Sequence, residues 1–166
     1  MSNTVFKLQM PFPAPGTPAR PNVQTIEPQI QSATAPVTLF GVPVKMVAGR
    51  ATAIAAADTA AVVYGFSVRP WPGQDFTFAP AFGNAVPPGA NFPIDILRRG
   101  YIMVQVNAGV PAAQGPVYMR IATPSGAKVI GGIEAVADGA NTVVIVGATF
   151  QGLVDENSVA EVAFNI

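Results

Sequence analysis

Residues 101–122 decide the fold class, and they read YIMVQVNAGVPAAQGPVYMRIA. β-branched and aromatic residues gather in 101–107 and again in 116–122, whereas Gly, Pro and Ala fill the stretch between them. Two such runs separated by turn-forming residues are typical of β-strands. We therefore expect a β-hairpin whose two strands are joined by the loop 108–115.

Similar runs lie on both sides of this stretch, bounded by Gly, Pro, Asn or Asp. The other expected strands are residues 36–47, 62–69, 128–135, 142–150 and 159–166. Their spacing predicts a mainly β domain, either a jelly-roll-like sandwich or a barrel. Two stretches do not follow the pattern: the alanine-rich residues 51–61 suit a short helix or a strand equally, and residues 71–91 predict a long loop.

The first 35 residues differ from the rest because they contain six prolines mixed with Gln, Asn, Thr and Ser. Proline fixes φ and removes an amide donor, so this stretch predicts an extended, polyproline-like conformation. We divide the chain into a Pro-rich extended N-terminal arm, residues 1–35, and a single β-rich domain, residues 36–166. A flexible tail is the alternative, but Phe6, Leu8 and Phe12 favour an arm that lies along a neighbouring subunit, since disordered tails are usually poor in such residues.

The composition predicts a protein whose surface binds a partner protein. Only 11% of the residues are charged, 50% are hydrophobic, the formal net charge is zero and the mean hydropathy is +0.40. Nucleic-acid binding requires clustered positive charge, so we expect no nucleic-acid partner. The longest weakly polar stretch, residues 51–66, is too short to cross a bilayer, so we expect no membrane partner either.

Most enzyme chemistry is excluded because the chain contains no His and no Cys. Without them there is no Ser-His-Asp triad, no imidazole base and no ordinary zinc, haem or iron–sulfur site. Ser125 and Lys128 match the S-x-x-K spacing of penicillin-recognising enzymes, but that chemistry needs a helix and this pair follows Pro124 in an expected turn. We expect no enzymatic activity, no metal and no cofactor.

The candidate functional residues are therefore those suited to a protein interface. Aromatic and arginine side chains are enriched at interface hot spots, and they occur here in the arm, in the 71–91 loop and in a basic pair before a strand. The expected contact residues are Phe6, Leu8, Phe12, Trp71, Phe76, Phe78, Phe82, Arg98 and Arg99.

Several segments of the domain resemble the structural cement proteins of tailed bacteriophages. They are 41–49 (GVPVKMVAG), 64–69 (YGFSVR), 97–104 (LRRGYIMV), 116–120 (PVYMR) and the Gly131-Gly132 pair. The resemblance covers residues 40–166 and leaves out the Pro-rich arm. It implies a β-rich capsid decoration protein that sits on the outer surface of the virion head as a homo-dimer or homo-trimer and clamps neighbouring major capsid protein subunits. It also implies synthesis in the host cytoplasm and no catalysis, cofactor or metal.

Two rival functions follow from other features of the sequence. A receptor- or carbohydrate-binding β module of the virion would use the aromatic loop between Trp71 and Phe82 as a sugar platform. A carboxylate-based hydrolase would use Asp155 and Glu156 as acid and base, although Asp155-Glu156-Asn157 is more typical of a turn.

Overall fold

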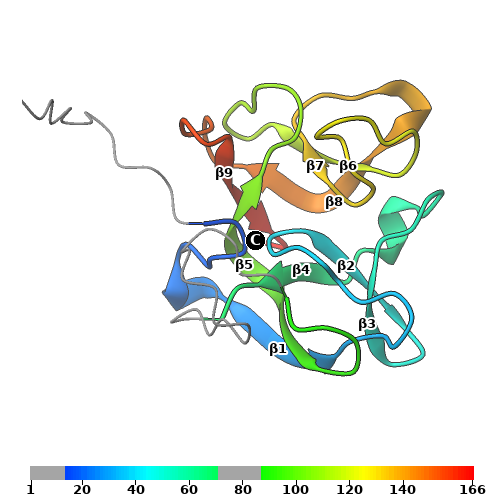
Figure 1. The fold of residues 1–166 in the computed structure, drawn as a ribbon. Coiled ribbons are helices and arrows are strands. Elements are labelled where there is room, and N and C mark those ends of the chain that lie inside the picture. The colour runs from blue at the N-terminus through cyan, green and yellow to red at the C-terminus, as the bar shows by residue number, and fades with distance from the viewer. Residues whose placement is uncertain (1–13, 71–86) are drawn as a thin grey trace, which may run out of the picture.

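The computed structural model describes residues 14–70 and 87–166 (Figure 1). In chain order the strands are β1 (Thr25–Ile30), β2 (Pro43–Val47), β3 (Arg50–Ala53), β4 (Gly65–Val68), β5 (Pro93–Gln105), β6 (Pro116–Arg120), β7 (Ile133–Glu134), β8 (Thr142–Phe150) and β9 (Val159–Phe164). Three 3-10 helices lie between them, η1 (Pro21–Val23), η2 (Ala60–Val62) and η3 (Gly139–Asn141). The mainly β fold predicted from the sequence is confirmed.

Strand β5 belongs to two curled antiparallel sheets. Its beginning pairs with β1 and β4, and β2 and β3 continue this first sheet. Its end pairs with β9, and β8, β6 and β7 continue the second sheet. Parallel bridges join the far ends of each sheet, Gln31 to Ala51 in the first and Val106 to Ile133 in the second. Each sheet therefore curls toward closure, as in a barrel, which leaves few free strand edges.

Gly100 lies where β5 passes from the first sheet to the second. Its φ is +135°, in a region that L side chains rarely adopt, and a Cβ there would lie 3.0 Å from the Cβ of Gln24. Glycine is the residue that tolerates both the conformation and the close approach. The position of Gly100 thus permits one strand to serve both sheets.

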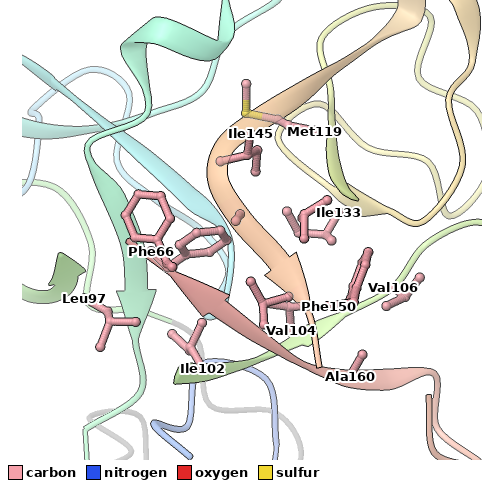
Figure 2. Close-up of a cluster of buried hydrophobic side chains, with 14 of the residues drawn as sticks. Phe66, Leu97, Ile102, Val104, Val106, Met119, Ile133, Ile145, Phe150 and Ala160 are labelled. Carbon is pink, nitrogen blue, oxygen red and sulfur yellow. The ribbon is translucent and has the colours of Figure 1, made fainter. Parts of the chain in front are cut away.

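One large hydrophobic cluster joins the two sheets (Figure 2). Phe66 of β4 packs edge-on against Phe164 of β9, with ring centroids 5.2 Å apart. Both rings are almost fully buried, together with Leu97 and Ile102, which flank the crossing point of β5. A smaller cluster around Val44 fills the first sheet alone. The sheets consequently share a core as well as a strand.

The hairpin expected for residues 101–122 is wrong. Both segments are strands, but this part of β5 pairs with β9, whereas β6 pairs with β7 and β8. The intervening loop leads to β8, since the Gln114 amide donates to the carbonyl of Phe150 and the Phe150 amide donates to the carbonyl of Gly115. Local alternation identifies strands, but a long loop leaves their partners undetermined.

The other expected elements agree in part with the structure. The expected strand 142–150 is confirmed as β8, and 159–166 contains β9. Residues 51–61 contain both alternatives, since β3 ends at Ala53 and η2 begins at Ala60. Of 128–135 only Ile133–Glu134 is a strand, because Gly131 has φ +78° and lies in a turn.

Part of the region predicted as the arm lies against the domain of its own chain. The amides of Gly16 and Ala19 donate to carbonyls of β5, and β1 pairs with β5 along its length. The amide of Gln31 also faces the start of β5, since it donates to the carbonyl of Phe92. Because amides alternate along a strand, the nitrogen of Pro28 faces away from β5, so a proline is tolerated in this edge strand.

Candidate interaction surfaces

Two observations on the described residues concern metal binding and the S-x-x-K pattern. They contain no group of three His, Cys, Asp or Glu that could hold a metal ion. Ser125 and Lys128 exchange backbone hydrogen bonds of 2.9 and 3.0 Å, so the S-x-x-K pattern forms a tight turn and not the helix that its chemistry needs. In the same part of the chain, no helix is long and apolar enough to span a bilayer.

Arg120 forms a buried ion-pair cluster. Its guanidinium donates to the carboxylate of Glu134, which is also buried, and to Asp138 at 2.6 Å. It also donates to the carbonyls of Ala122 and Thr123. The hydrogen bonds to Glu134 and Asp138 raise the pKa of Arg120, and the one between Arg120 and Asp138 lowers the pKa of Asp138. The cluster holds the loop after β6 against the second sheet, so we interpret it as structural.

Arg98 is engaged in contacts within the chain. Its guanidinium lies 3.5 Å from the centre of the Tyr64 ring and 3.7 Å from a carboxylate oxygen of Glu27. The Tyr64 hydroxyl donates to the same carboxylate at 2.6 Å, and this hydrogen bond raises the pKa of Tyr64. The neighbouring Arg99 is exposed and has no ion pair within residues 14–70 and 87–166. Of the predicted basic pair, Arg99 is the one available to a partner.

Arg20 fastens the segment before β1 to the second sheet. It donates two hydrogen bonds of 2.8 Å to the carboxylate of Glu161 on β9, and its guanidinium lies 4.0 Å from the centre of the Tyr101 ring. Arg20 and Glu161 are 141 residues apart. No local sequence signal could have identified this pair.

Most of the predicted contact residues fall outside the described part of the chain. They are Phe6, Leu8, Phe12, Trp71, Phe76, Phe78 and Phe82. The residues that border the 71–86 segment are anchored: the Arg69 amide donates to the carbonyl of Gly16, and the Gln31 side chain donates to the carbonyl of Pro88. The structure places Arg98 and Arg99 on β5, and the role of the whole set in binding stays a prediction.

Large apolar side chains are exposed at several places that the sequence did not single out. The most exposed of these side chains in the described ranges are Val110, Val146, Leu153, Phe92 and Ile166. Val146 has a relative exposure of 76%, Leu153 of 67% and Phe92 of 58%. Single exposed apolar residues are normal on protein surfaces, and it is a contiguous apolar patch that marks a site of contact with a partner.

Comparison with known proteins identifies the family. The family model of the XM1 gp53 minor capsid protein matches residues 2–164. A chain of the solved structure "The capsid of Myoviridae Phage XM1" is similar over 99% of this chain and 97% of that one, with a TM-score of 0.70 and 20% sequence identity, a level at which the likeness concerns the fold. No curated protein matches. The expected relation to structural proteins of phages is confirmed, and the chain belongs to the XM1 gp53 minor capsid protein family, whose members are structural proteins of the virion.

Proposed function

We propose that this chain is a cement protein that binds the outer surface of a phage head and clamps neighbouring major capsid protein subunits. The observation that carries the proposal is the match to a minor capsid protein family over residues 2–164. A protein added to a shell in this way must hold its own shape and offer contact surface to the shell. Both properties are supported by the described residues.

The fold suits a rigid clamp. Two sheets share β5 and one hydrophobic cluster, and ion pairs such as Arg20–Glu161 and Arg120–Glu134 connect distant segments of the chain. Exposed apolar side chains such as Phe92 and Leu153 can then be buried against capsid subunits. Apolar burial contributes roughly 25 cal/mol per Å² before ordering costs are subtracted. Each contact can be weak because many copies act on one shell.

Residues 1–13 are proposed to reach a neighbouring subunit, with Phe6, Leu8 and Phe12 as contacts. The hydrogen bonds of the residues that follow this segment, Ala14 to Thr17, support this role. The Thr17 amide donates to the carbonyl of Ala14 at 3.1 Å, and Gly16, with φ +87°, donates to the carbonyl of Met103. This turn fixes Ala14 on the second sheet, so a contact made by the preceding residues would be transmitted directly to the domain.

A second set of proposed contacts is the aromatic segment with Trp71, together with the exposed Arg99. Both borders of residues 71–86 are held by hydrogen bonds to the domain, through Arg69 on one side and Pro88 on the other. Force from a partner bound to that segment would therefore reach the first sheet at both borders, near Arg69 and near Pro88. Arg99 would add an ion pair to an acidic group on the shell.

The decisive experiment is co-sedimentation of the purified protein with mature heads from which it has been stripped. We expect saturable binding at a fixed ratio to the major capsid protein, and heads that resist heat better when the protein is bound. Absence of binding at micromolar protein would overturn the cement function. A glycan-binding assay with the Trp71→Ala variant would then test the virion carbohydrate-binding alternative.

A further inference from the structure

Three separate segments of the chain meet where β5 passes from the first sheet to the second. On one side η1 lies close to Gly100, since a Cβ on Gly100 would lie 3.1 Å from the carbonyl oxygen of Val23. On the other side Gly100 pairs with Phe164, the last residue of β9. The residues that follow β9 therefore also lie at this point, and Figure 1 marks the C-terminus in the same region, beside β5.

Each of these segments presents an exposed side chain. Val23 of η1 is 43% exposed, and Ile166, two residues after β9, is 57% exposed. Arg99 of β5 is exposed as well and lies on the strand between them. The Asn165 side chain donates to the carbonyl of Arg98 at 3.0 Å, which holds the end of the chain beside β5. We call Val23, Arg99 and Ile166 the crossing surface.

Two polar atoms next to the crossing surface are unpaired. Among the described residues, the buried side-chain nitrogen and oxygen atoms without a hydrogen bond are Gln24 Oε1 and Arg98 Nε. Gln24 follows Val23 in sequence, and Arg98 precedes Arg99. Buried polar atoms are normally paired, and proteins depart from such rules chiefly at functional sites. These atoms distinguish the crossing surface from the other places where apolar side chains are exposed.

The charge of the crossing surface indicates the chemistry of its partner. Arg99 forms no ion pair within residues 14–70 and 87–166. In the same ranges every carboxylate except that of Asp95 already has a partner within the chain, and Asp95 is half-buried in β5. The described part of a second copy therefore offers Arg99 little free negative charge. An acidic group of a different protein complements Arg99 better.

We propose that the crossing surface binds a segment of the major capsid protein in which a carboxylate is flanked by apolar side chains. The carboxylate pairs with Arg99, and its apolar neighbours are buried against Val23 and Ile166. This inference rests on the proposed cement function, and it specifies where the described fold holds the shell and by which chemistry. Because β5 belongs to both sheets, force applied at this surface reaches both of them.

Zero-length cross-linking tests the acidic partner. A carbodiimide activates a carboxylate, a lysine amine attacks the activated carbon, and an amide forms while the carbodiimide leaves as a urea; arginine does not react. The Arg99→Lys variant bound to stripped heads should therefore become linked, through position 99, to an Asp or Glu of the major capsid protein, as identified by mass spectrometry. The matched control Arg50→Lys changes an exposed arginine near the start of β5 that also lacks an ion pair, and it should give about ten-fold less product. A link from position 99 to a second copy, or no link, would overturn the proposal.

The affinity of the full chain for stripped heads tests the apolar part of the surface. Val23→Ser and Ile166→Ser should each weaken binding about five-fold, and Arg99→Glu should weaken it about ten-fold. Added salt should weaken binding of the wild type more than binding of Arg99→Glu, because it screens the ion pair. The matched control is Val110→Ser in the loop between β5 and β6, where an apolar side chain is 76% exposed, and it should bind like the wild type.

The outcomes separate this inference from the cement function. A wild type that binds heads while the variants of the crossing surface bind equally well overturns the inference and leaves the cement function in place. A wild type that does not bind stripped heads contradicts the cement function, and with it the capsid partner of this surface. Thermal melts of each variant verify that a loss of binding does not come from a loss of the fold.

Discussion

Adjacent arginines on β5 have different roles at the scale of single residues. Arg98 lies over the Tyr64 ring and beside the Glu27 carboxylate, whereas the side chain of Arg99 is exposed without an ion pair among the described residues. Alternate residues of a strand point to opposite faces, so two neighbours in sequence can serve the fold and the surface separately. Substitution of Arg98 should therefore change the stability of the fold, whereas substitution of Arg99 should change binding to a partner.

We expect Arg99→Glu to weaken binding to stripped heads while leaving the melting temperature unchanged, because the side chain makes no stabilising ion pair within the described chain. Arg98→Ala should lower the free energy of unfolding by about 1 kcal/mol through loss of its contact with the Tyr64 ring. Co-sedimentation and thermal melts distinguish the two effects. A destabilised Arg99→Glu variant would contradict this assignment.

Asp138 makes stability depend on pH. The hydrogen bond from Arg120 lowers the pKa of Asp138 in the folded state below the ordinary aspartate value. The stabilisation from this carboxylate is therefore present above the ordinary pKa of about 3.9 and is lost as pH falls through the lower folded-state value. The Asp138→Asn variant lacks this carboxylate at every pH.

We accordingly expect Asp138→Asn to melt below the wild type at neutral pH, and the difference between the two melting temperatures to shrink as pH falls below about 4. Thermal melts of both proteins across this range measure the difference, and the comparison removes the common effect of the other carboxylates. A difference that stays constant down to the lowest pH would show that the ion pair to Arg120 does not stabilise the fold.

At the scale of elements, residues 14–30 belong structurally to the domain. Strand β1 pairs with β5, and Arg20 is bonded to Glu161. Deletion of residues 1–13 should therefore leave the melting temperature close to that of the full chain and weaken binding to heads. Deletion of residues 1–30 removes β1 and exposes the edge of β5, so it should abolish or strongly reduce cooperative unfolding.

Circular dichroism melts and co-sedimentation of the two truncated chains test this expectation. If removal of residues 1–30 leaves the melt unchanged, β1 contributes nothing to the stability of the first sheet. If removal of residues 1–13 leaves binding to heads unchanged, the proposed contacts of Phe6, Leu8 and Phe12 are wrong.

Strands could be predicted from the sequence, whereas their partners could not. Residues 142–150 and 159–164 are rich in β-branched and aromatic side chains, and this local property predicts a strand without reference to the rest of the chain. Pairing of β5 with β9 depends on residues that are more than 50 positions apart. The same limit applies to the surface: the exposure of Phe92 and Leu153 follows from how the sheets curl, which no local pattern encodes.

At the scale of the whole molecule, the two sheets form one structural unit because they share β5 and the packed pair Phe66 and Phe164. A clamp that transmits load between capsid subunits needs this property. If the two sheets could unfold independently, the less stable sheet would unfold first under load and the connection would be lost. We therefore expect a single calorimetric transition, with the calorimetric enthalpy equal to the van't Hoff enthalpy.

Phe66→Ala tests this coupling, because Phe66 belongs to the first sheet while its ring packs against the second. Removing a buried phenylalanine ring costs about 3–5 kcal/mol, and in one cooperative unit the whole loss should appear as a lower midpoint of a single transition. Val44→Ala, in the smaller cluster of the first sheet, is the control, and it too should shift that one transition. Two separated transitions in either variant would mean that the sheets unfold independently, and a shared strand would then be insufficient to make the molecule a rigid clamp.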